Sequence, residues 1–209
     1  MHAIFRGVSV IPVLTIDRER DAVPLARALF EGGLPVIEVT MRTAAAGAAV
    51  AAIRRELAQV VVGAGTLLRA ADVATAVQAG AGFLVSPGLT PDLAAAALAA
   101  ELPYLPGVAT PSEVMAARAL GICVMKFFPA EALGGVAWFR ALAPVFRGVA
   151  FCPTGGIDET RAAEYLALAN VPMVGGSWMV PRDAVAAGDW SRIRRLAERA
   201  AAIGQREAA

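Results

Sequence analysis

Apolar positions along this chain follow two alternating patterns. Short runs rich in Val, Ile and Leu recur about every 20 to 26 residues, and alanine-rich segments with apolar residues at helical spacing lie between them. Repeated strand–helix units of this kind are typical of a parallel sheet, because parallel strands need a crossover connection. We therefore expect eight strands, over residues 8–14, 35–40, 60–64, 82–86, 103–106, 122–127, 149–151 and 172–174.

The alanine-rich segments carry the usual signals for helix ends. Thr90-Pro91 and Thr110-Pro111 each place a capping residue before a proline at the first helical position. Gly32, Gly80 and Gly121 are expected to stop the helices that precede them. The expected helices span residues 20–31, 45–57, 70–79, 91–100, 111–120, 135–146, 158–168 and 189–202.

Eight such units predict a single (β/α)8 TIM barrel in which residues 1–209 form one domain. No linker rich in Ser or Gly and no change of composition divides the chain. A doubly wound open sheet would show the same periodicity, so periodicity alone does not separate the two folds. The positions of the candidate chemical residues favour the barrel, because barrel chemistry gathers at the C-terminal ends of the strands.

Charge and hydropathy argue against several classes of protein. A net charge of +1 without any lysine-rich stretch gives no electrostatic footprint for nucleic acid. The longest uncharged stretches, residues 73–91 and 165–181, are interrupted by Gly, Pro and polar residues, unlike a membrane span. We expect a protein that binds neither nucleic acid nor membrane.

The two cysteines, Cys123 and Cys152, both lie in apolar runs, where a free cysteine behaves as a small hydrophobic residue. Strand alternation puts Val124 and Lys126 on one face of their strand and Cys123 and Met125 on the other, so if Lys126 points into the barrel, Cys123 points out towards the helices. Core packing is therefore our interpretation of Cys123, and two cysteines do not make a disulfide framework. The apolar run Val8–Ile16 differs from a signal peptide because Pro12 interrupts it and no small-residue cleavage site follows. These features predict a cytoplasmic protein.

Lys126 is the only lysine, and it lies in the apolar run Gly121–Pro129. The other 18 basic residues are arginines, which cannot lose their proton, so this position indicates a need for an amine that can. A buried neutral lysine is the usual nucleophile for a Schiff base with a carbonyl substrate. The alternative is a chain that avoids lysine and keeps one whose stem covers apolar surface at a strand end.

A second candidate is the strand around Glu38, where Glu38, Thr40 and Arg42 project to one side. Charges on one face of an apolar strand are costly unless they face a polar pocket or each other. One interpretation is a structural Glu38–Arg42 pair. The other makes Glu38 a general acid/base and Arg42 a clamp for a substrate carboxylate.

Paired glycines follow the last two expected strands, in Thr154-Gly-Gly-Ile-Asp158 and in Gly175-Gly-Ser177. The loops after strands seven and eight of a barrel frequently bind phosphate, and paired glycines expose backbone N–H groups to an anion. Thr66, after the third strand, is a further candidate donor to a carboxylate, whereas Ser86-Pro-Gly88 has the composition of a turn. Together these turns predict an anion site.

The sequence lacks the residues that several other kinds of catalytic or binding site require. His2 is the only histidine, so neither a histidine triad nor a histidine-bound metal is expected. No phosphate-binding P-loop or dinucleotide fingerprint occurs in the sequence. We therefore expect carbonyl chemistry at the lysine, without a metal and without a cofactor.

Taken together, the motifs resemble those of the bacterial 2-keto-3-deoxy-6-phosphogluconate (KDPG) aldolases, which include bifunctional 4-hydroxy-2-oxoglutarate (KHG) aldolases. The resemblance implies a class I aldolase on a (β/α)8 barrel, commonly a homotrimer, that acts on a small keto-acid. It covers nearly the whole chain through Val36-Ile-Glu-Val-Thr-Met-Arg-Thr43, Val62-Gly-Ala-Gly-Thr66, Val85-Ser-Pro-Gly88, Lys126-Phe-Phe-Pro-Ala-Glu131, Phe151-Cys-Pro-Thr-Gly-Gly156 and Gly175-Gly-Ser-Trp178.

The resemblance also implies roles for individual residues. Lys126 would form the Schiff base with the substrate, and Glu38 would be the general acid/base. Arg42 and Thr66 would hold the pyruvate carboxylate. Pro87 and Phe128 would line the pocket, and the phosphate-bearing half would be bound by Thr154, Gly155, Gly156, Gly175, Gly176 and Ser177.

Two features differ from typical members of the family. The amino terminus looks shorter, so we expect a truncated helix at the bottom of the barrel. Leu133 replaces an asparagine of many relatives near the expected site mouth, where it would alter aldehyde preference. Two further hypotheses stay open: a phosphosugar isomerase or epimerase that uses Glu38 as its base, and a non-catalytic phosphometabolite-binding protein.

Overall fold

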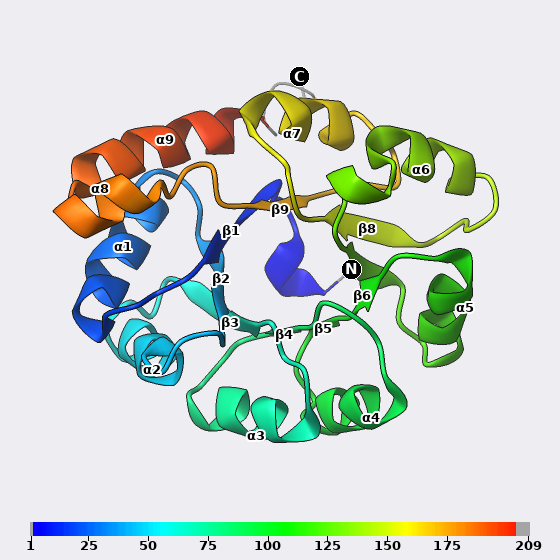
Figure 1. Ribbon diagram of the computed structural model, residues 1–209, viewed down its shortest axis with the longest axis horizontal. Helices are drawn as coiled ribbons and strands as arrows, with labels where there is room; N and C mark the ends of the chain where they lie inside the picture. The colour runs from blue at the N-terminus through cyan, green and yellow to red at the C-terminus, as the bar shows by residue number, and fades with distance from the viewer. Residues whose placement is uncertain (1, 204–209) are drawn as a thin grey trace.

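The computed structural model describes residues 2–203 and consists of alternating strands and helices around one centre (Figure 1). The strands are β1 (Val10–Leu14), β2 (Val36–Thr40), β3 (Val61–Gly65), β4 (Leu84–Val85), β5 (Tyr104–Leu105), β6 (Gly107–Val108), β7 (Val124–Phe127), β8 (Ala150–Pro153) and β9 (Val174–Gly176). The α-helices are α1 (Glu19–Glu31), α2 (Ala46–Glu56), α3 (Ala70–Gln78), α4 (Pro91–Ala99), α5 (Pro111–Ala119), α6 (Gly135–Leu142), α7 (Glu159–Leu166), α8 (Arg182–Ala187) and α9 (Trp190–Ile203). Two 3-10 turns complete the described residues, η1 (Ala3–Phe5) and η2 (Glu131–Leu133).

All strand pairs are parallel, as the strand–helix alternation predicts. They form a six-stranded sheet in the order β5-β4-β3-β2-β1-β9 and a three-stranded sheet in the order β6-β7-β8. The sheets curl around the centre of the molecule, with the α-helices on the outside (Figure 1). The predicted α/β fold with a parallel sheet is therefore confirmed.

Most element boundaries differ from the prediction by one to four residues, and the set of strands and α-helices differs in two places. Residues 103–106 were expected to form one strand, but the chain makes two short strands, β5 and β6, on either side of Pro106. Proline lacks the N–H that a strand needs for its ladder, which explains the interruption. Helix α8 was not expected, because its six residues are too short for a helical periodicity to be recognised.

Helix ends follow the expected chemistry at most positions. Thr110 caps α5, since its Oγ1 accepts a hydrogen bond from the Glu113 backbone N–H at 3.3 Å, and the Glu113 carboxylate accepts one from the Thr110 N–H at 2.9 Å. Thr90 precedes the N1 proline of α4 but makes no side-chain cap hydrogen bond. Gly80 follows α3 in the left-handed region with φ +83°, where a side chain would be strained.

Apolar side chains form two clusters on opposite faces of the curled sheet. The larger cluster joins the outer face of the strands to the helices and includes Met125 and Phe127. The smaller cluster fills the interior, where η1 lies inside the ring of strands (Figure 1) and Phe5 packs edge-on against Phe83 at 5.3 Å between ring centroids. A single 3-10 turn therefore occupies the centre at the amino terminus. The other members of the interior cluster are Ile11, Val36, Val85, Leu105, Val124, Cys152 and Met173.

The interpretation of Cys123 as a core residue is wrong. Its side chain is exposed, because β7 begins only at Val124 and Cys123 lies in the connection before the strand. The alternation itself is confirmed, since Val124 joins the interior cluster and Met125 joins the outer one. Cys152, in contrast, is buried in the interior as a small hydrophobic residue would be.

Candidate functional site

Lys126 and Glu38 meet in the interior although they are 88 residues apart in sequence. Lys126 Nζ donates a hydrogen bond to Glu38 Oε1 at 3.3 Å, and the two side chains are only 7% and 5% exposed. Both strands place these side chains on the inner face by ordinary alternation. A buried amine and carboxylate in direct contact are expensive unless they serve each other or a substrate, so this pair is the centre of the candidate active site.

Gly65 makes room for this pair and was not identified from the sequence as a functional position. A Cβ added at Gly65 would lie 1.9 Å from Glu38 Oε1, so any side chain here would displace the Glu38 carboxylate. A glycine inside a strand often marks such a close approach, and this is the signal that could have identified it. Gly65 therefore fixes the space in which the Glu38 carboxylate lies.

Arg42 and Thr66 lie together at the ends of β2 and β3. Arg42 Nε donates a hydrogen bond to Thr66 Oγ1 at 3.2 Å, and the Met41 N–H donates one to the Gly65 carbonyl oxygen at 2.8 Å. Thr66 has a positive φ of 60°, which is uncommon for a β-branched residue and typical of functional sites. Arg42 and Thr66, which were predicted to hold the same carboxylate, are thus in contact. Only Nε of the Arg42 guanidinium donates to Thr66.

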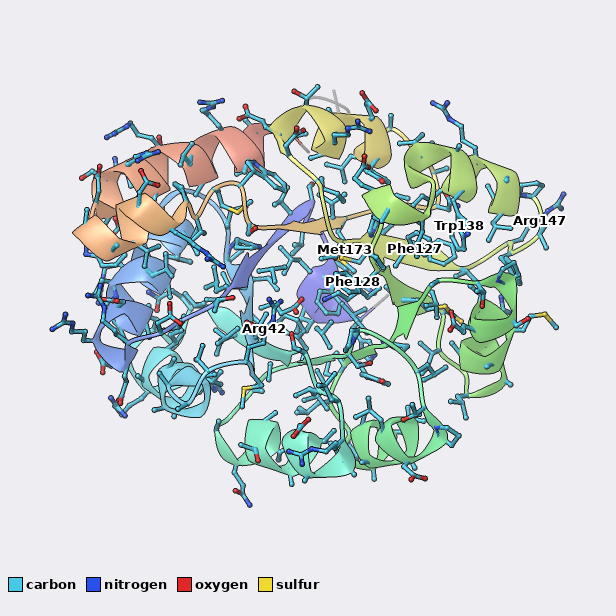
Figure 2. All side chains as sticks on the ribbon, viewed as in Figure 1. Arg42, Phe127, Phe128, Trp138, Arg147 and Met173 are labelled. Carbon is cyan, nitrogen blue, oxygen red and sulfur yellow. The ribbon has the colours of Figure 1, made fainter. Side chains whose placement is uncertain are left out.

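Phe128 lies beside Lys126 at the end of β7. Lys126 Nζ is 5.6 Å from the centre of the Phe128 ring, and this ring is half-exposed. Figure 2 shows the labelled Arg42 and Phe128 side chains toward the centre of the molecule. Pro87 is half-buried and lies against β6, where a Cβ on Gly107 would be 2.2 Å from the Pro87 carbonyl oxygen.

The two glycine turns are neighbours in space. Thr154 forms a parallel bridge with Gly175, which joins the end of β8 to β9, and the buried Thr154 side chain occupies the space that a side chain on Gly175 would need. Gly155 and Gly156 both have positive φ, of 105° and 79°. Ser177 follows β9 and is exposed. The six predicted anion-binding residues therefore lie at adjoining strand ends.

Glu131 contacts the Gly155-Gly156 turn, because its backbone N–H donates a hydrogen bond to the Gly155 carbonyl oxygen at 3.1 Å. Sequence reasoning did not identify this residue as part of the site. Its carboxylate accepts a hydrogen bond from the Tyr165 hydroxyl and pairs with Arg161 at 2.6 Å. Burial raises the pKa of Tyr165, and the Glu131 carboxylate raises it further, so this hydroxyl stays protonated and donates. Tyr165 and Arg161 lie 34 and 30 residues after Glu131, and no local pattern in the sequence predicts these contacts.

Cys152 is the β8 residue paired with Lys126 in the sheet register. Burial raises the pKa of its thiol to about 12, while Lys126 lowers it and Glu38 raises it to a smaller extent. A neutral thiol is a poor nucleophile. Cys152 is therefore a poor candidate for the nucleophile of this site.

A cavity of about 670 Å³ opens between the loops that follow β1 and β9. Arg42 and Ser177 both line it, whereas Lys126 and Glu38 are not among its lining residues. Four further charged residues of its wall are Asp17, Arg18, Asp21 and Arg182. Within residues 2–203 no group of three or more His, Cys, Asp or Glu side chains is arranged to hold a metal ion. In the same part of the chain, no helix is long and apolar enough to cross a membrane.

Comparison with known proteins gives consistent matches over nearly the whole chain. Residues 1–196 match the aldolase family described as KDPG and KHG aldolase. A 2-dehydro-3-deoxy-phosphogluconate aldolase of Treponema pallidum is 50% identical over 91% of both chains, and a KHG/KDPG aldolase of Escherichia coli is 48% identical over 91% of this chain and 90% of that one. A solved KDPG aldolase of Legionella pneumophila superposes with a TM-score of 0.91, at 44% identity over 94% of this chain and 95% of that chain. In that structure pyruvate is captured as a covalent carbinolamine.

Proposed function

This chain belongs to the KDPG and KHG aldolase family, and we propose that it cleaves KDPG to pyruvate and glyceraldehyde 3-phosphate by class I chemistry at Lys126. Cleavage of KHG to pyruvate and glyoxylate is the second reaction that we propose. The observation that carries the proposal is the 3.3 Å contact between the buried Lys126 amine and the Glu38 carboxylate. A nucleophile and an acid/base group within hydrogen-bond reach are what imine chemistry requires.

In the proposed reaction, Lys126 Nζ attacks C2 of the keto-acid, and the resulting carbinolamine loses water to give a protonated imine. Glu38, directly or through a water, takes the proton of the C4 hydroxyl. The electrons of the C3–C4 bond move to the iminium, so the aldehyde leaves and an enamine remains. Protonation of the enamine at C3 and hydrolysis of the imine then release pyruvate and return the lysine.

The surrounding residues have roles that fit their positions. Arg42 and Thr66 hold the pyruvate carboxylate, because a guanidinium matches a carboxylate with two parallel hydrogen bonds. Pro87 and Phe128 line the apolar side of the pocket. The phosphate-bearing half is bound by backbone N–H groups and hydroxyls of the two glycine turns, at Thr154, Gly155, Gly156, Gly175, Gly176 and Ser177.

A closed (β/α)8 barrel over residues 1–209 is the architecture that we propose for this site. On one side, the Thr154–Gly175 bridge joins β8 of the three-stranded sheet to β9 of the six-stranded sheet. On the other side, β5 continues directly into β6 through Pro106, which joins the same two sheets and supports closure. If β5 and β6 are counted as one strand, the ring has the eight strands of this fold. We further propose a homotrimer that works in the cytoplasm, a property that follows from the family resemblance alone.

Borohydride trapping tests the proposed function. Incubation with pyruvate and sodium borohydride should add the mass of a reduced pyruvate adduct, and peptide mapping should place it on Lys126. A Lys126→Arg variant is the matched control, because it keeps the charge but cannot form an imine. An enzyme that turns over KDPG without any trapped adduct would contradict the covalent mechanism and favour an isomerase-type base at Glu38.

A further inference from the structure

The proposed phosphate site lacks a positive charge of its own. Its six residues offer backbone N–H groups and hydroxyls, all of which are neutral. Arg161 lies nearby, but its guanidinium is engaged by the Glu131 carboxylate at 2.6 Å. A phosphate dianion in a partly desolvated pocket is usually matched by arginine or lysine, so the structure calls for a cation that approaches Ser177 from another direction.

The cavity that Ser177 lines provides such a cation. Arg18 is occupied, because its Nε pairs with Asp21 Oδ2 at 2.6 Å. Arg42 donates to Thr66 and faces the end assigned to the pyruvate carboxylate. Arg182 lines the same cavity and makes no ion pair with any carboxylate of residues 2–203.

The negative groups around Arg182 do not neutralise it. The adjacent Asp183 pairs with Arg192 at 2.6 Å, and this pairing lowers the pKa of the Asp183 carboxyl. Asp17 also lines the cavity but forms no ion pair within residues 2–203. Counting formal charges, the wall carries Arg18, Arg42 and Arg182 against Asp17 and Asp21, which leaves an excess positive charge before any substrate binds.

The chain also holds Arg182 near Ser177 by local geometry. The Val180 N–H donates a hydrogen bond to the Ser177 carbonyl oxygen at 2.9 Å, so the segment between β9 and α8 folds into a turn. Arg182 then begins α8, where a cation in the first turn opposes the helix dipole and adds nothing to helix stability. Helix stability therefore gives no reason for a cation at this position.

We propose that Arg182 is a specificity-determining residue that pairs with the distal phosphate of the substrate across this cavity. The inference rests on the proposed function and extends it, because it assigns the charge that distinguishes a phosphorylated aldehyde arm from an unphosphorylated one. The loop after β9 thus contributes both a neutral donor, Ser177, and a cation, Arg182, to the same anion.

The test compares two substrates that differ only in the phosphate, KDPG and 2-keto-3-deoxygluconate. In Arg182→Ala the ratio of their kcat/KM values should fall about tenfold, since a hydrogen bond to a charged group is worth about that much. Arg182→Gln keeps the length of the side chain without its charge and should show a similar fall. Arg195→Ala removes an exposed arginine from α9 and should leave the ratio unchanged.

Each outcome decides the inference. An unchanged ratio in Arg182→Ala, an equal loss on both substrates, or a wild-type ratio in Arg182→Gln would overturn it. Melting temperatures of all variants check that the fold is intact. The proposed function is judged separately by pyruvate trapping in the wild-type protein: absence of trapping refutes the aldolase mechanism, whereas normal trapping with an unmoved ratio refutes only the role of Arg182.

Discussion

The two ends of the site use different groups: side chains on strands at one end and glycine turns at the other. The end at Lys126 and Glu38 consists of charged side chains on buried strands, held by sheet register and by the empty space at Gly65. The end at Gly155, Gly156 and Ser177 consists of turns beyond the strands, where Gly156 and Ser177 are exposed. Groups that take part in bond cleavage need fixed geometry and a dry environment, whereas a phosphate is recognised by many donors around it. Changes at the first end should therefore affect turnover, and changes at the second end should affect substrate binding.

Lys126→Arg should have the largest effect. We expect cleavage to fall by at least about a thousandfold, because a guanidinium cannot form the imine and loss of a covalent nucleophile costs several orders of magnitude. Steady-state kinetics with KDPG measure the loss, and circular dichroism checks the fold. Residual activity above about a thousandth of wild type would show that this end of the site does not work through covalent chemistry.

Glu38→Gln should come next, with kcat lower by about a hundredfold or more, since only the proton transfer is removed and the shape is kept. Slow borohydride trapping of pyruvate should persist in this variant. The informative result is a low kcat together with trapping that persists. If trapping is lost as completely as in Lys126→Arg, Glu38 is needed for the attack on C2 as well as for the later proton transfers.

Ser177→Asp tests the other end. A carboxylate beside the glycine turns should repel the phosphate and raise KM for KDPG by about tenfold, while kcat changes little. KHG has no phosphate, so its KM should rise less. Ser177→Asn is the matched control, because it is similar in size but uncharged. Equal penalties on KDPG and KHG would place the phosphate elsewhere and remove the contrast between the two ends.

The smallest effect that we predict is a difference between the two cysteines in their rate of reaction with a thiol reagent. At pH 8 the native protein should react quickly with a thiol reagent at the exposed Cys123, whereas Cys152, with a pKa of about 12, should stay unreactive. The thiolate is the reactive form, and a raised pKa keeps it scarce until the pH approaches 12. Counting labelled cysteines by mass spectrometry, with Cys123→Ser as control, checks this. Rapid labelling of Cys152 in the folded state would show that the Lys126 end is open to solvent.

The sequence predicted the features that depend on local patterns. Apolar runs marked the strands, and strand alternation put Glu38, Thr40 and Arg42 on one face. The family resemblance, not the alternation, assigned Lys126 and Glu38 to one site. The Glu131 contacts and the Gly65–Glu38 fit could not be predicted, because they depend on distances between segments far apart in the chain. Cys123 was misplaced because an apolar neighbourhood in sequence does not say where a strand begins.

The burial of the single lysine has a practical consequence for chemical modification. Reagents that acylate amines usually label many surface lysines, but the surface of this protein presents none. An amine-directed dye, crosslinker or resin should therefore attach at the backbone amino group of the chain and leave Lys126 free as long as the protein stays folded. Addition of pyruvate during labelling would protect the lysine further, and the amount of label on Lys126 after mild unfolding would report how much of the site had opened.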